Sequence, residues 1–280
     1  MTRVLAAVDA SAATCPVLQE AQLFGDLIGA TSKAIYVGRR GKHASRLAEH
    51  VGVPVRVLHG SPAGVILHEA AADDVALAVV GARGLPSGRS PFGHVTRRVL
   101  QQLPKGVVVV PPDFAPIKLA HILVPLDGTY ETGLAIARAT GLFARGGSDF
   151  VVMHTLTPDT MPTMLDHAGA LDIWAQHFLR RLGPELADAR VEVRVGAPGA
   201  NASEFTRVEP IDLIVLVWRR TFAGQHGQVV KDVLAHSGVP VLLLPMDVPM
   251  TEPFRRGSSG TFGTTRGAVQ GLGSGEKAIR

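Results

Sequence analysis

A glycine-rich segment in the first half of this 280-residue chain has the composition of a phosphate-binding loop. Its sequence is VVGARGLPSGRSPFGHVTRRVL (residues 79–100), in which an apolar strand ends at Gly81 and a helix opens at Gly93. Glycines let the backbone approach a ligand closely, and the first N–H groups of a helix favour a phosphate. Thr96 adds a hydroxyl donor and Arg83 a positive charge. Many such loops are only tight connections, so the segment alone leaves both interpretations open.

The elements that must position this segment are apolar runs alternating with helical patterns. The predicted strands of the first half are residues 3–8, 33–38, 53–59, 75–80 and 107–111, and its predicted helices are 13–29, 42–51, 62–72 and 93–103. Alternating strands and helices, with strands apolar on both faces, indicate a parallel sheet covered on both sides. In such sheets a ligand binds beyond the carboxyl ends of the strands, which is where the glycine-rich loop begins.

The same order of elements occurs twice. The run RVLAAVDAS (3–11) reappears as HILVPLDGT (121–129), DVALAVV (74–80) as PIDLIVL (210–216), and GHVTRRVL (93–100) as GQVVKDVL (227–234). The second copy predicts strands at 120–126, 149–155, 190–195, 211–217 and 239–245, and helices at 130–145, 166–188, 199–208 and 227–237. Five strand-like runs kept in order indicate a duplication. The fold class is therefore α/β, with two tandem, doubly wound, five-stranded parallel-sheet domains.

The predicted boundaries follow from composition. The first domain is residues 1–112, a proline-rich linker covers 113–118, and the second domain is 119–246. Residues 247–280 are rich in Gly, Ser and Thr with few apolar anchors, so we expect a disordered tail.

Composition excludes several classes of protein. A single cysteine excludes a disulfide framework and favours a reducing, cytoplasmic setting. We expect no membrane span, because no apolar stretch approaches about 18 residues. The net charge of +4 is mild, and the Arg97-Arg98 and Arg219-Arg220 pairs form no extended stripe, which argues against nucleic acid. The histidines show no metal-ligand spacing and no hydrolytic triad is legible, so neither metal ligands nor catalytic residues are predicted.

The glycine-rich segment resembles the signature of the universal stress protein family, G-x2-G-x9-G-[ST] after a fourth strand. The matching residues are Gly81-Ala82-Arg83-Gly84, then eight residues, then Gly93-His94-Val95-Thr96. The loop is thus one residue shorter than the pattern, and His94 stands where Ser or Thr is usual. The motifs VDAS (8–11) and GSPAGVI (60–66) support the resemblance, which extends over two copies, about residues 1–112 and 117–246.

The resemblance implies a Rossmann-like fold of the adenine-nucleotide α-hydrolase type and a site for ATP or AMP, with magnesium accompanying ATP. It places Asp9 near the adenosine part of the ligand and Val37 at the base through backbone contacts. Around the ribose and phosphates it implies Gly81, Arg83, Gly84, Gly93, His94, Val95 and Thr96. Family members commonly dimerise through their last strands, so we expect the two halves to pair within one chain; exposed sheet edges would also allow a homodimer.

The second half departs from the signature. Val217-Trp218-Arg219-Arg220 replaces the first glycine pair, and Trp218 is bulky where a phosphate needs close backbone approach. Gly227 is retained, but the hydroxyls after it are lost, and Asp127 keeps the first-strand acid. We interpret this half as a degenerate copy with a mainly structural role.

Three functions compete at this point. The leading hypothesis is a regulatory protein of the universal stress type, not an enzyme, whose first domain binds ATP or AMP. The second is a scaffold for oligomerisation or partner docking that binds no nucleotide. The third is an ATP-using enzyme of the α-hydrolase type, which would need a fuller phosphate loop and a substrate domain.

Overall fold

The computed structural model describes residues 2–39, 42–83, 92–115, 118–126, 146–157 and 189–246, together with the single helical residues 133, 136 and 143. The elements of the first half, in chain order, are β1 (Arg3–Val8), α1 (Thr14–Ile28), β2 (Thr31–Val37), α2 (Lys42–Val51), β3 (Val55–Leu58), α3 (Pro62–Ala71), β4 (Val75–Gly81), α4 (His94–Gln102) and β5 (Gly106–Val110). Those of the second half are β6 (His121–Leu126), β7 (Asp149–Leu156), β8 (Arg190–Val195), α7 (Pro198–Val208), β9 (Leu213–Trp218), α8 (Gly224–His236) and β10 (Val241–Pro245).

The ten strands agree with the sequence prediction to within two residues at each end. The largest difference among the described helices is at α8, which begins at Gly224 rather than at residue 227. The expected helix at 166–188, the tail at 247–280 and Asp127 lie outside the described residues, and the helix expected at 130–145 is described only at Gly133, Ile136 and Phe143.

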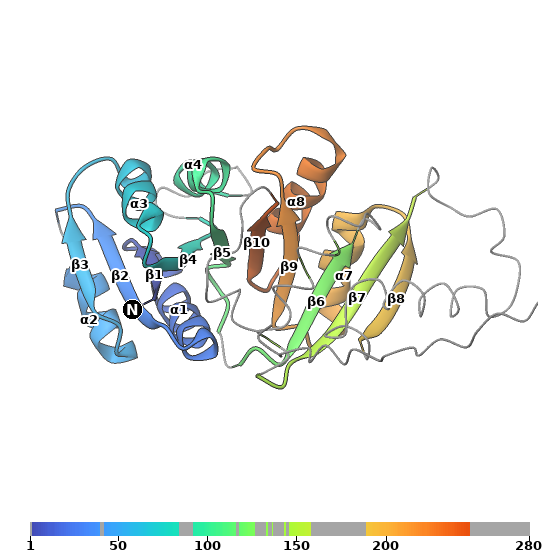
Figure 1. Ribbon diagram of the computed structural model, residues 1–280, viewed down its shortest axis with the longest axis horizontal. Helices are drawn as coiled ribbons and strands as arrows, with labels where there is room; N and C mark the ends of the chain where they lie inside the picture. The colour runs from blue at the N-terminus through green and yellow to red at the C-terminus, as the bar shows by residue number, and fades with distance from the viewer. Residues whose placement is uncertain are drawn as a thin grey trace, which may run out of the picture.

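The strands form one ten-stranded sheet in the order β3-β2-β1-β4-β5-β10-β9-β6-β7-β8 (Figure 1). Within each half all neighbouring strands run parallel, which confirms the predicted fold class of two doubly wound five-stranded units. The halves meet where β5 and β10 pair antiparallel, with Val109 opposite Val241 and Val107 opposite Leu243. The expected pairing of the two last strands within one chain is therefore present.

The central strands are buried on both faces. Every residue of β5, β9 and β10 is buried, because apolar residues pack on both faces of the sheet: those of α1 and α2 with Ile136 and Phe143 on one face, and those of α3, α4, α7 and α8 on the other. A strand that is covered on both faces must be apolar on both sides, and runs such as GVVVV and LIVLVW have this character. The edge strands differ: β8 is only half-buried and carries Arg190, Glu192 and Arg194, which form ion pairs along the edge. Charged edges oppose pairing with another sheet.

Two apolar cores lie on opposite faces of the sheet, and each crosses the β5–β10 seam. The core on the α1 face joins Phe24 and Val108 of the first half to Leu213 and Phe143 of the second. The core on the other face joins residues of α4 to residues of α7 and α8. The two halves therefore share their cores as well as their sheet.

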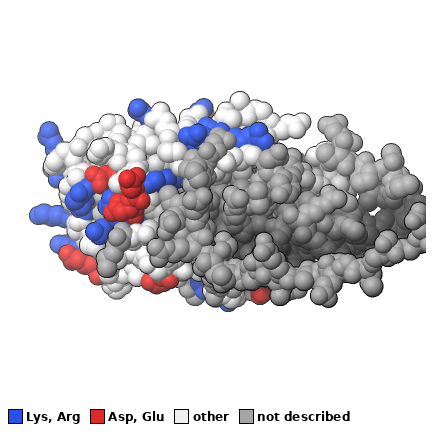
Figure 2. Space-filling view, in the orientation of Figure 1, with Lys and Arg blue, Asp and Glu red and all other residues white. Residues whose placement is uncertain are grey.

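The surface and the helices add two observations. In the region of the first half, acidic and basic side chains lie next to each other on the face drawn in Figure 2. Among the described residues, no helix combines the length and the apolar character that crossing a bilayer requires.

Candidate functional site

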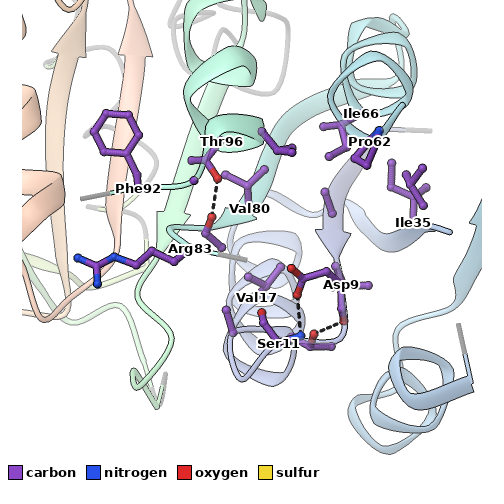
Figure 3. Close-up of a pocket in the computed structure, with 18 of the residues that line it drawn as sticks. Asp9, Ser11, Val17, Ile35, Pro62, Ile66, Val80, Arg83, Phe92 and Thr96 are labelled. Carbon is purple, nitrogen blue, oxygen red and sulfur yellow. Dashed lines mark hydrogen bonds between the residues drawn. The ribbon is translucent and has the colours of Figure 1, made fainter. Parts of the chain in front are cut away.

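A cavity of about 530 Å³ opens at the carboxyl ends of β1, β2 and β4, between α1, α3 and the start of α4 (Figure 3). Residues far apart in the sequence meet there because neighbouring parallel strands end at the same edge of the sheet. Eight residues expected to form the ligand site line it: Asp9, Val37, Gly81, Arg83, Gly93, His94, Val95 and Thr96. Gly84, the ninth, lies outside the described residues.

One wall of the cavity is aliphatic, and the sequence interpretation did not include it. Ala7 lies opposite Ile35 of β2 and opposite Val80 of β4, so the three side chains form a row across adjacent strands. Ile66 of α3 and Val8 extend this surface. A flat apolar ligand group would be buried against it without leaving a polar group unsatisfied. The signal in the sequence was available, since each of these strand residues stands within three positions of a predicted strand end.

Asp9 is held in place directly after β1. The backbone N–H of Ser11 donates to Asp9 Oδ1 over 2.8 Å, and the Thr14 hydroxyl donates to the Asp9 carbonyl oxygen (Figure 3). These bonds tie the turn to the first residue of α1 and fix the carboxylate at the cavity wall. An oriented carboxylate can accept hydrogen bonds from hydroxyl or amino groups of a ligand.

The opposite side of the cavity is the start of α4. The helix begins after Gly93 with no side chain capping its N-terminus and no acidic residue in its first turn. The first N–H groups of the helix therefore carry the positive end of its dipole without a competing carboxylate. Arg83 and His94 are exposed at the same side, where the guanidinium of Arg83 adds positive charge.

Thr96 joins the start of α4 to the sheet. Its side chain is buried, and its hydroxyl donates to the carbonyl oxygen of Gly81 over 2.8 Å. The hydroxyl proton thus joins α4 to the end of β4 and is already engaged, so in this structure it is not offered to a phosphate. In this structure the bond positions the helix.

Gly81 lies at a close approach of two elements. A Cβ atom built on it would lie 3.0 Å from the Cβ of Ala13, which immediately precedes α1. The end of β4 and the start of α1 therefore approach each other closely, and a side chain at Gly81 would require Ala13 to shift by a few tenths of an ångström. By contrast, the φ of −66° at Gly93 is accessible to any residue.

The corresponding place in the second half is filled by protein. A Cβ on Gly227 would lie 2.4 Å from the carbonyl carbon of Phe222, so the chain's own backbone occupies the space in front of that helical turn. Trp218, the counterpart of Ala82, is 2% exposed and points into the shared core. A ring nitrogen of His226 lies 3.3 Å from the Val217 carbonyl oxygen, where the first half uses Thr96. The described residues of the second half thus build packing in front of α8, whereas in the first half the start of α4 borders a cavity.

The sequence model of the universal stress protein family matches residues 32–111 and again 118–245, which together cover well over half of the chain. The chain belongs to the universal stress protein family. The two matches fall on the two halves of the sheet, so this universal stress protein carries two copies of the family's domain in tandem.

Solved structures agree with this assignment at the level of the fold. The chain is 14% identical to a putative universal stress protein from Pseudomonas aeruginosa UCBPP-PA14, with a TM-score of 0.65 over 87% of this chain and 93% of that one. It is 16% identical to a universal stress protein from Archaeoglobus fulgidus DSM 4304, with a TM-score of 0.62 over 87% of this chain and 98% of that one. No curated protein matches the sequence significantly.

Proposed function

We propose that the chain is a nucleotide-responsive regulatory protein that binds ATP or AMP in the cavity of its first half. In this proposal the second half has a structural role, and occupancy of the cavity biases the conformation of the protein or its choice of partner. The observation that carries the proposal is the convergence on one cavity of eight residues expected, from the family resemblance, to hold such a ligand.

The chemistry of the walls fits the two ends of an adenine nucleotide. The aliphatic row of Ala7, Ile35 and Val80 suits a base, and Asp9 can accept hydrogen bonds from ribose hydroxyls. The uncapped start of α4 suits a phosphate. The cavity volume of about 530 Å³ also lies in the range of roughly 300–1,000 Å³ that is usual for small-molecule sites.

The same walls favour retention of the ligand over its turnover. Asp9 is the only carboxylate among the described residues that line the cavity, and its Oδ1 already accepts the Ser11 N–H. Phosphoryl transfer generally uses separate groups to hold magnesium and to orient the attacking nucleophile. We therefore propose a regulatory role, with hydrolysis slow at most.

The test is a calorimetric titration of ATP and of AMP, with and without magnesium, into the wild-type protein and Ala7→Phe. Ala7 lies in the middle of the aliphatic wall, so a phenyl ring there fills the cavity. We expect one saturable site in the wild type and affinity at least tenfold weaker in Ala7→Phe. Ala200→Phe, the same exchange at an exposed position of α7, is the matched control and should bind like the wild type.

Two results would contradict the proposal. If neither nucleotide gives binding heat or a thermal shift at millimolar concentration, the cavity serves another purpose and a scaffold function gains support. If Ala7→Phe binds as tightly as the wild type, the nucleotide site lies elsewhere in the chain.

A further inference from the structure

The loop that follows β9 in the second half lies against the phosphate side of the cavity in the first half. Its Phe222 ring stacks on the ring of Phe92, with centroids 5.0 Å apart and an interplanar angle of 26°. The guanidinium of Arg97, one turn into α4, lies 5.7 Å from the centroid of the same Phe222 ring. One side chain of the second half thus contacts Phe92, two residues before α4, and Arg97 near the start of α4 itself.

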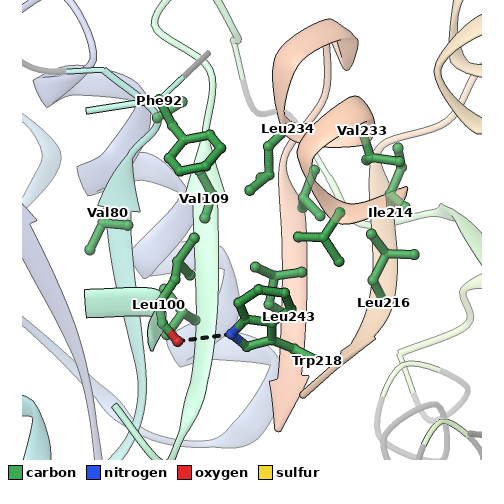
Figure 4. Close-up of a cluster of buried hydrophobic side chains, with 14 of the residues drawn as sticks. Val80, Phe92, Leu100, Val109, Ile214, Leu216, Trp218, Val233, Leu234 and Leu243 are labelled. Carbon is green, nitrogen blue, oxygen red and sulfur yellow. Dashed lines mark hydrogen bonds between the residues drawn. The ribbon is translucent and has the colours of Figure 1, made fainter. Parts of the chain in front are cut away.

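Trp218 fixes the position of this loop relative to α4. Its indole Nε1 donates to the carbonyl oxygen of Leu100 over 2.8 Å, a bond between residues 118 positions apart (Figure 4). The indole also packs on Phe222, with centroids 4.7 Å apart. Both ends of α4 are therefore fixed by the second half: its last turns through Trp218 and its start through Phe222.

Phe92 connects the Phe222 ring to the wall of the cavity. It is 5% exposed, lines the cavity and stands immediately before Gly93, the residue that precedes the first turn of α4. Gly93 in turn donates its N–H to the carbonyl oxygen of Ala82 over 2.9 Å, which ties the start of α4 to the end of β4. Phe222 does not line the cavity, so any effect on a ligand passes through Phe92 and the helix behind it.

We propose that Phe222 is a positioning residue for the nucleotide site, so that the degenerate half supports the phosphate-binding end of the half that keeps the cavity. The inference rests on the proposed nucleotide function and adds to it a role for the second half. The direction of the N–H groups at the start of α4 depends on where Phe92 lies, and Phe92 is held by a ring from the other half. A stacked aromatic pair typically changes an equilibrium constant by about two- to tenfold.

The experiment compares Phe222→Ala and Phe222→Leu with the wild type by titrating ATP and AMP calorimetrically, and measures urea unfolding of each protein in parallel. We expect affinity about tenfold weaker in Phe222→Ala and about threefold weaker in Phe222→Leu, which keeps apolar volume but loses the ring. The matched control is Phe205→Ala on α7, a fully buried ring of the second half that contacts Arg190 and Arg194 rather than α4. It should lose stability and keep wild-type affinity under conditions where it is folded.

The outcomes separate this inference from the function on which it rests. Binding to the wild type that Ala7→Phe weakens, but that both Phe222 variants leave within the error of the wild type, overturns the positioning role alone. An equal loss of affinity in Phe205→Ala also overturns it, because the effect would then follow from general destabilisation. Absence of binding to the wild type overturns the proposed function first. If Phe222→Ala does not fold, Phe222→Leu decides by the same criterion.

Discussion

At the scale of single residues, the most unusual group in the described structure is the carboxyl of Glu20. It lies on α1 with no exposed surface, and neither of its oxygens has a hydrogen-bond partner. Burial, and secondarily the negative charge of Asp212 in the second half, raise the pKa of Glu20 from 4.5 to about 8. The group is therefore mainly protonated at neutral pH, which avoids a buried, unpaired charge.

This raised pKa predicts that stability falls as the solution becomes alkaline. Between pH 4.5 and 8 the folded protein holds a proton on Glu20 that the unfolded chain has released, so the contribution is complete below pH 4.5 and lost as pH rises through 8. Glu20→Gln removes this dependence. Since one pKa unit corresponds to about 1.4 kcal/mol, we expect the variant to gain roughly 3 to 5 kcal/mol over the wild type between pH 5 and pH 9.

Urea unfolding at several pH values measures this difference. Glu49→Gln, the same exchange on the exposed side of α2, is the control and should follow the wild type. A wild-type stability that changes between pH 5 and pH 9 no more than that of Glu20→Gln would show that Glu20 is not buried as a neutral acid.

At the scale of elements, the two halves differ around the last helix. In the first half the described residues at the start of α4 border a cavity, and in the second the chain after β9 folds back so that the Phe222 backbone touches Gly227 within α8. The helix and its connection are therefore packed too closely for any side chain at that position.

Gly227→Ala should consequently destabilise the protein, although alanine favours helices. The added methyl group would meet the Phe222 backbone at 2.4 to 2.7 Å, and backbone atoms cannot move aside as a flexible side chain can. We expect a loss of about 2 kcal/mol or more in the free energy of unfolding. Gly238→Ala, where an added Cβ meets nothing within 4 Å, should change it by less than about 1 kcal/mol. Equal effects of the two substitutions would refute the close packing.

Sequence reasoning predicted most of the elements because their signal is local. Strands such as β5 and β9 are apolar at every position, which buried parallel strands require, and the duplication repeated each pattern once. The cavity residues were predictable as a group because the carboxyl ends of parallel strands coincide in space.

Contacts between the halves could not be predicted in this way. The stacking of Phe92 on Phe222 joins residues 130 positions apart, and nothing in either segment marks them as neighbours. The burial of Glu20 was hidden for the same reason, because an acid on a helix is usually exposed and Asp212 is brought near only by the tertiary fold. The hydrogen bond from the Thr96 hydroxyl to the Gly81 carbonyl oxygen could not be predicted either, because the distance between the two groups depends on how α4 packs.

At the scale of the whole molecule, one continuous sheet and two shared cores join the halves into one structural unit. Val108 and Leu242 pair across the seam and belong to the same core on the α1 face. Two domains joined only by a linker would be able to unfold separately, whereas here unfolding either half exposes apolar surface of the other.

We therefore expect one cooperative urea transition for the whole chain. In a Trp174→Phe background Trp218 is the only remaining tryptophan, and it lies at the contact with α4. The midpoint of its fluorescence transition should coincide with that of the far-ultraviolet circular dichroism. Leu242→Ala, which removes a fully buried side chain at the seam, should shift both midpoints together, with a loss of about 2 to 5 kcal/mol. Two resolved transitions would show that the halves are independent.

The antiparallel seam has a consequence for how such a molecule can change over generations. When two identical chains meet edge to edge, every substitution appears on both sides of the symmetry axis, and a large residue that helps one side must be tolerated on the other. Here a covalent connection encodes the two sides at separate positions of one chain, so position 82 can hold a small alanine while its counterpart, Trp218, places an indole in the shared core. Because the copies are joined in one chain, a substitution that stabilises one copy need not also be tolerated in the other.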